Sequence, residues 1–182
     1  MYCNEINATI PPVETLVIGY GNTLRADDGA GPAVIEKLTS LLPRRLAQKV
    51  QLISCGQLTP ELAVDIAPCQ RIIFIDASMA LPAGSISINP VQEECGAVLM
   101  GHYSTPGTVL AMAQSAFGAR PHAWVAAIGC QSVEISDKLT PRVAAAVDRL
   151  ARHVCHAIAR WSKGQTFLPE MLPNSAPALK AI

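Results

Sequence analysis

The chain of 182 residues lacks a long hydrophobic run and an excess of either charge. No stretch of about 18 apolar residues occurs, so the sequence predicts no transmembrane helix and no membrane partner. Lysine and arginine together number 14, as do aspartate and glutamate, which gives a formal net charge of zero without a basic cluster. Proteins that bind nucleic acids need a cationic surface, so we expect no nucleic-acid partner.

Other familiar signals are missing too. Residues 1–14 lack the cationic start and apolar run of a secretory signal, so we expect the protein to be cytoplasmic. Six cysteines are scattered without a C-x-x-C pair, and we expect free thiols that pack as small apolar groups. Neither the G-x-S-x-G elbow of serine hydrolases nor the H-E-x-x-H motif of zinc proteases occurs.

Hydrophobic residues, in contrast, make up 50% of the chain, against 15% charged residues. This composition supports a large core with strands buried on both faces. At this length we expect one α/β domain over residues 1–162. Beyond it, prolines interrupt Ser, Asn and Ala, so we interpret residues 163–182 as a flexible tail.

Predicted strands and helices alternate along the chain. The expected strands are 15–19, 50–55, 71–76, 84–89 and 123–128, the fourth an edge strand because polar and apolar residues alternate in it. The expected helices are 31–42, a short one from residue 60, 106–117 after a Thr105 cap, and 141–161 after a Thr140 cap. This order predicts an α/β three-layer sandwich, in which a mostly parallel twisted sheet of about five strands has helices on both faces.

The segment 17–31 reads Val-Ile-Gly-Tyr-Gly-Asn-Thr-Leu-Arg-Ala-Asp-Asp-Gly-Ala-Gly and carries the most functional information. It suggests a dinucleotide loop, but Leu24 stands where the G-x-G-x-x-G fingerprint needs its third glycine. The next strand ends without the acidic residue that would bind a ribose, and the carboxylates of Asp27 and Asp28 would repel phosphate. The loop therefore favours a ligand that binds anionic oxygen, such as a metal ion.

Three potential ligands converge at one edge of the predicted sheet. Asp28 follows the first strand, Asp76 ends the third, and His102 lies just before the helix at 106–117. Ligand sites of open α/β sheets lie beyond the carboxyl ends of the strands, so we expect these side chains to lie together. Two carboxylates and one imidazole suit nickel or zinc, and a helix N-terminus near His102 disfavours its protonated form.

Purely structural roles are the alternatives for these residues. Asp27 and Asp28 suit the first turn of a helix as caps, Asp76 suits a turn, and His102 suits a surface position. Asp27 is interpreted mainly as a cap or as a support for the neighbouring site residue.

The residues before Asp28 are expected to set the shape of the loop. Gly19 and Gly21 permit positive φ and close backbone approach, and Asn22 tolerates the left-handed region. We interpret all three as shaping the loop that presents Asp28. A direct role of the Asn22 side chain in polarising a scissile carbonyl is the alternative.

Three segments in order resemble the hydrogenase maturation endopeptidases, which trim the C-terminal tail of the large subunit of nickel–iron hydrogenases. The matching residues of the first segment are Gly19, Gly21, Asn22, Leu24, Asp27, Asp28, Gly29 and Gly31. The second segment, 72–77, is an apolar strand ending in Asp-Ala, and the third, 101–106, has a His just before a helix. The resemblance spans residues 15–156.

This resemblance implies that Asp28, Asp76 and His102 form the catalytic and metal-contacting site, with Asp28 at a position where many members have Glu. It implies that nickel arrives in the substrate, that zinc or cadmium substitutes for it in vitro, and that the partner is the nickel-loaded large-subunit precursor. The general base stays open between a water activated by nickel and the carboxylate of Asp28 or Asp76. A non-catalytic chaperone that checks nickel and a nucleotide-binding Rossmann enzyme remain as alternative functions.

Overall fold

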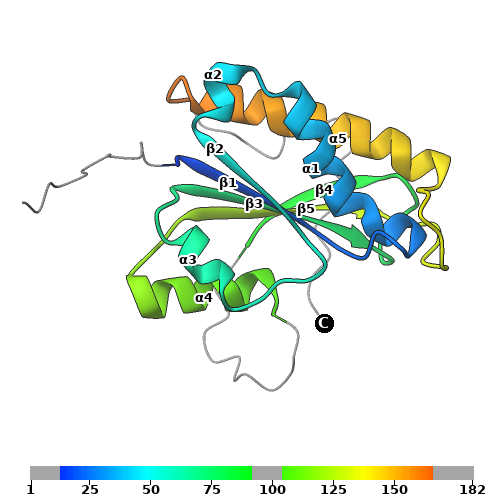
Figure 1. Ribbon diagram of the computed structural model, residues 1–182, viewed down its shortest axis with the longest axis horizontal. Coiled ribbons are helices and arrows are strands. Elements are labelled where there is room, and N and C mark those ends of the chain that lie inside the picture. Colours follow the sequence, from blue (N-terminus) through cyan, green and yellow to red (C-terminus); the bar gives the residue numbers. More distant parts are fainter. Residues whose placement is uncertain (1–12, 92–103, 166–182) are drawn as a thin grey trace, which may run out of the picture.

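A five-stranded sheet lies between two layers of helices in the computed structural model, which describes residues 13–91 and 104–165 (Figure 1). The strand order is β2-β1-β3-β5-β4, and every pair is parallel except β4 with β5. The strands are β1 Thr15–Tyr20, β2 Val50–Cys55, β3 Arg71–Ser78, β4 Ile86–Pro90 and β5 His122–Gly129. The predicted α/β class with a mostly parallel sheet is confirmed, and the alternating strand is an edge strand as expected.

The helices divide between the two faces of the sheet. Figure 1 shows α1, α2 and α5 over one face and α3 and α4 over the other. Their bounds are α1 Ala30–Leu41, α2 Arg44–Ala47, α3 Leu62–Ile66, α4 Pro106–Phe117 and α5 Pro141–Trp161, and a 3-10 helix η1, Ala26–Gly29, precedes α1. The sequence did not predict α2, a single turn after Pro43. No helix in the described segments is long and apolar enough to cross a membrane.

Two hydrophobic clusters fill the space between the sheet and its helices. Ile73 and Ile75 of β3 pack with α1 and α5, whereas Ile72 and Phe74 pack with α3 and α4. Successive side chains of a strand point to opposite faces, so a strand covered on both sides needs an unbroken apolar run. Burial of each such side chain stabilises the fold by roughly 1.5–3 kcal/mol. The segment predicted as a tail, 163–182, lies outside the described residues beyond Gln165.

The order in which the chain adds strands to the sheet changes side between β1 and β3. From β1 the chain passes through α1 to β2 on one side, and from β2 it passes through α3 to β3 on the other. Gly19 pairs with Ile75, so the next residues, Tyr20 and Asp76, lie side by side at the carboxyl ends. A reversal of this kind leaves a crevice in which open α/β sheets bind ligands.

Glycine residues let the N-terminus of α1 lie directly on this part of the sheet. A Cβ atom on Gly31 would lie 2.7 Å from the carbonyl oxygen of Ile75 and closer still to that of Tyr20. A Cβ atom on Gly19 would in turn overlap the backbone of Gly31. The close approach fixes the position of the turn η1, which carries Asp28, relative to β3.

Gly31→Ala tests this packing. The added methyl group meets backbone atoms that cannot move aside, so we expect a loss of about 1–3 kcal/mol or more in the free energy of unfolding. Urea unfolding followed by circular dichroism measures it. Gly56→Ala is the matched control, because nothing lies within 4 Å of a Cβ atom there. Equal midpoints for the two variants would contradict the close approach.

Candidate active site

Asp28 lies in η1, at the N-terminal side of α1. Its Oδ2 atom accepts a hydrogen bond from the backbone N–H of Asn22 at 2.7 Å. Gly21 has a φ of +136°, and a Cβ atom there would overlap the carbonyl oxygen of Asp28. The side chain of Asn22 accepts the N–H of Leu24 at 2.9 Å, which closes the turn from the other side. The backbone of this loop therefore holds the Asp28 carboxylate at the end of β1.

Asp76 lies beside this loop on β3, which continues two residues beyond its predicted end. Its Oδ1 atom accepts the N–H of Ala77 at 2.8 Å, and its Oδ2 atom accepts the hydroxyl of Tyr20 at 2.9 Å. Burial raises the pKa of Asp76, these two hydrogen bonds oppose the rise, and the nearby Asp28 carboxylate adds to it. The pKa of Tyr20 is raised as well, by burial and then by Asp76. The structure thus brings Asp28 and Asp76 into electrostatic contact, with Tyr20 bonded to one of them.

Cys130, just beyond β5, is buried next to the same carboxylates. Burial and the charges of Asp27, Asp28 and Asp76 raise its pKa to about 11. A thiol with that pKa is protonated at neutral pH and is a poor nucleophile. Cys130 therefore lies near the carboxylates as an uncharged thiol.

Asp27 has no role as a helix cap. Its side chain is fully buried, and neither η1 nor α1 has a side-chain cap. Its carboxylate accepts the N–H groups of Gln131 at 2.8 Å, Ser132 at 3.0 Å and Thr140 at 2.6 Å, and the hydroxyl of Thr140 at 3.0 Å. Of the two roles expected for Asp27, a helix cap or a support for the neighbouring site residue, only the cap is wrong, because these donors in the loop between β5 and α5 bind the carboxylate instead.

Thr140 is the N-cap residue of α5, as predicted, but its side chain does not cap the helix. Its side chain makes no capping bond to α5, because its hydroxyl donates to Asp27. Thr105, by contrast, caps α4 as predicted, accepting the N–H of Thr108 at 3.1 Å.

The loop between β5 and α5 also holds a strained residue in place. Ala26 has a φ of +46°, which costs a residue with a Cβ atom roughly 1–2 kcal/mol. Its N–H donates to the carbonyl of Ser136 at 2.8 Å, and the N–H of Asp27 donates to that of Ser132 at 3.1 Å. Strain of this kind persists only where the surroundings determine the conformation, and here it sets the turn just before Asp28.

Asp28 and Asp76 supply two of the ligands that a divalent cation needs. Burial is the main cause of the raised pKa of Asp76, and the charge of Asp28 adds to it, so a cation between the two carboxylates would relieve their repulsion. Carboxylate oxygens bind zinc and nickel together with imidazole. Within residues 13–91 and 104–165, no three His, Cys, Asp or Glu residues group closely enough to hold a metal ion. His102, the expected third ligand, lies outside the described residues.

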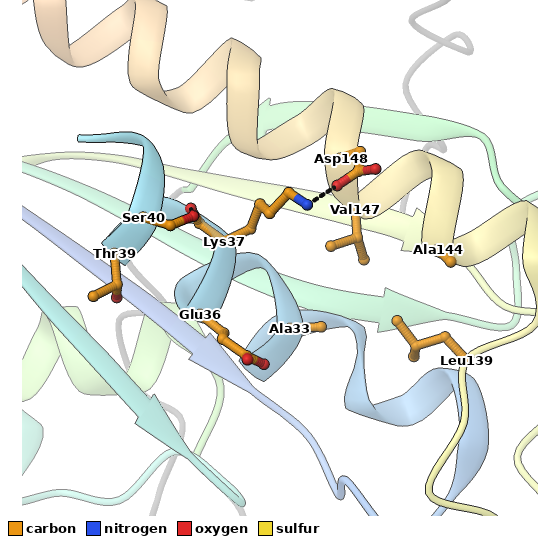
Figure 2. Close-up of a pocket in the computed structure, with 9 residues that line it drawn as sticks. All are labelled: Ala33, Glu36, Lys37, Thr39, Ser40, Leu139, Ala144, Val147 and Asp148. Carbon is orange, nitrogen blue, oxygen red and sulfur yellow. Dashed lines mark hydrogen bonds and ion pairs between the residues drawn. The ribbon is translucent and has the colours of Figure 1, made fainter. Parts of the chain in front are cut away.

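Surface grooves run along α1. One lies at the N-terminal end of α1 and is lined in part by Asn22, Pro32 and Ser54. Another lies between α1 and α5, where Lys37 and Asp148 form an ion pair of 2.8 Å (Figure 2). The groove in Figure 2 contains neither Asp28 nor Asp76, so we do not assign it to the site.

No protein-family model and no curated protein matches the chain, but solved structures do. The hydrogenase maturating endopeptidase HybD from E. coli is 28% identical, with a TM-score of 0.63 over 83% of this chain and 94% of HybD. The hydrogenase 2 maturation peptidase from a Thaumarchaeota archaeon is 27% identical, with a TM-score of 0.59 over 80% of this chain and 98% of that protein. The NiFe hydrogenase maturation protease HycI from Thermococcus kodakarensis is 19% identical and shows the fold alone, with a TM-score of 0.66 over 81% of this chain and 93% of HycI.

The fold therefore defines a class, the α/β proteins with a five-stranded sheet seen in these maturation proteases. The resemblance to the hydrogenase maturation endopeptidases, read from three sequence segments, is confirmed by solved structures that align with most of the chain. Sequence motifs gave no sign of Tyr20 or Cys130 at the site, because only the pairing of β1, β3 and β5 brings them there.

Asp27→Asn tests the bond network that fixes the site. The amide nitrogen cannot accept a hydrogen bond, so we expect a loss of about 1–3 kcal/mol in unfolding free energy at pH 7. Hydrogen bonds hold the pKa of Asp27 below its usual value despite burial. Its stabilising effect is therefore complete above the unfolded pKa of about 3.9 and is lost as pH falls through the folded value.

Urea unfolding between pH 7 and pH 3 measures this effect. The gap between wild type and Asp27→Asn should shrink below pH ~4. Asp137→Asn, an exposed carboxylate in the same loop, removes the same charge and should leave stability nearly unchanged. A gap that is independent of pH would show that Asp27 stabilises the fold by packing alone.

Proposed function

We propose that the protein is a cytoplasmic endopeptidase that removes the C-terminal extension of a nickel–iron hydrogenase large-subunit precursor after nickel insertion. The observation that carries the proposal is the meeting of Asp28 and Asp76 at the switch point of the sheet. HybD from E. coli, a hydrogenase maturating endopeptidase, shares this fold over 83% of the chain at 28% identity.

In this proposal the nickel belongs to the substrate. The carboxylate oxygens of Asp28 and Asp76, together with His102, contact it and so distinguish a loaded precursor from an empty one. A bound divalent cation supplies Lewis-acid polarisation of a carbonyl or a water molecule. The protein's own contribution is to hold the two carboxylates in place through Asn22, Ala77 and Tyr20, and to accept a proton on Asp28 or Asp76.

The mass of the precursor tests the proposed function. Nickel-loaded precursor is incubated with the purified protein and its intact mass is measured. We expect loss of one C-terminal peptide, only with nickel present, and no loss with Asp76→Asn. Asp65→Asn is the matched control: this carboxylate lies on α3 and accepts a hydrogen bond from the side chain of Gln51, near the start of β2 and away from the carboxyl ends of the strands. Stable association without a change in mass would instead identify a nickel-checking chaperone, and full processing by Asp76→Asn would exclude a role for that carboxylate.

Tyr20→Phe tests how Asp76 is oriented. The variant keeps the ring but leaves Oδ2 of Asp76 without its 2.9 Å partner, so the carboxylate can turn. Loss of a group that orients a metal ligand typically lowers affinity or activity by about 10–100-fold, and we expect a fall in kcat of that order. Single-turnover processing measures it. Ile53→Val removes a methyl group beside the same core cluster and should process normally; equal rates for both variants would assign Tyr20 a packing role only.

A further inference from the structure

Large apolar side chains are exposed on the loops that surround the candidate site. Leu24, after β1, is 65% exposed, Met79, after β3, is 67% exposed, and Ile135, after β5, is 92% exposed. Isolated exposed hydrophobic residues are ordinary on protein surfaces. These three, however, follow the strands whose carboxyl ends form the site, and none contributes to the core.

Leu24 and Ile135 are neighbours in space although they lie far apart in sequence. Arg25 and Ser136 form a parallel β-bridge. The N–H of Ser136 donates to the carbonyl of Leu24 at 3.0 Å, and the N–H of Ala26 donates to that of Ser136 at 2.8 Å. Leu24 and Ile135 each come one residue before a bridge residue, so they occupy adjacent positions on the two segments.

The pair stands on a rigid support. The Arg25 side chain donates to the carbonyl of Val133 at 3.2 Å, and the buried Asp27 carboxylate binds the loop at Gln131, Ser132 and Thr140. Ordering a loop on binding lowers affinity, and a loop that is already fixed avoids that loss. Exposed apolar side chains on such a loop can bury their surface against a partner without that loss.

The charges around the pair indicate what binds there. The exposed side chains in these loops include Arg25 and Lys138 but also Glu134 and Asp137, so neither sign dominates. A polyanion needs a basic surface, whereas an apolar centre with a mixed polar rim fits another polypeptide. Leu24 precedes Asp28 by four residues, and the N–H of Asp28 donates to the carbonyl of Arg25, the residue after Leu24, at 3.0 Å, so a polypeptide bound at Asp28 has the pair close at hand.

We propose that Leu24 and Ile135 form a docking surface for apolar side chains of the protein substrate, in the segment that carries the cleaved bond. This inference rests on the proposed function and adds to it the surface by which the precursor is held. The pair binds substrate without taking part in the chemistry, so its loss affects binding and leaves the carboxylates in place.

The test compares two pairs of exposed apolar residues. The first, called the site-loop variant, carries Leu24→Ser and Ile135→Ser. The control variant carries Val64→Ser and Phe117→Ser, whose side chains on α3 and α4 are 63% and 54% exposed. Dissociation constants for nickel-loaded precursor are measured by calorimetry, and KM and kcat by intact mass. Urea unfolding checks that both variants keep wild-type stability.

We expect the site-loop variant to bind precursor at least about tenfold more weakly and to raise KM similarly, while kcat stays within about twofold of wild type and the control is unaffected. Equal binding by the site-loop and control variants would overturn the docking surface. Wild-type protein that binds but does not cleave would contradict the proposed protease, and the dissociation constants would still decide the docking surface. Wild-type protein that does not bind precursor would overturn both.

Discussion

The buried carboxylate of Asp27 is the interaction on which the site depends. It accepts hydrogen bonds from Gln131, Ser132 and Thr140, which lie 104 to 113 residues further along the chain. A buried charge is stable only when its hydrogen bonds are satisfied, and four donors meet that need here. These bonds join the turn that carries Asp28 to the loop that follows β5, so the two segments form one unit. The positive φ of Ala26 is tolerated inside this unit.

Two carboxylates from different strands become one site because of this unit and the contact between α1 and the sheet. Gly31 lets α1 approach the ends of β1 and β3, which places Asp28 next to Asp76. Tyr20 and Ala77 bind the two oxygen atoms of Asp76, so its orientation does not depend on a ligand. The fold thus brings two carboxylates together at the carboxyl ends of β1 and β3, whereas exposed apolar residues lie on the loops that follow β1, β3 and β5.

The sheet was largely predictable from sequence because its signals are local. The apolar run of β3 and the alternation in β4 reflect burial on two faces and on one face, and each can be read within a few residues. The proximity of Asp28 and Asp76 also followed from strand order, since Asp28 follows β1 and Asp76 lies near the carboxyl end of the parallel strand β3. The expected third ligand, His102, lies outside the described residues, so its placement stays a prediction.

The bonds of Asp27 and Thr140 could not be predicted in this way. Each residue occupies a position that suits a helix cap, and no local feature reveals that their side chains bind each other across 113 residues. The bond from Tyr20 to Asp76 has the same origin, because it requires the register that pairs Gly19 with Ile75. Local propensity therefore predicts the strands and helices, whereas the hydrogen bonds of buried polar groups depend on partners far along the chain.

The most direct test of the account is the position of a cation in a crystal of the protein soaked in cadmium, located by anomalous scattering. If Asp28 and Asp76 form one site, the cation lies between them and bonds to an oxygen atom of each. A cadmium ion bound only elsewhere, or to one carboxylate with the other turned away, would contradict the claim that the fold assembles these two residues into a single site.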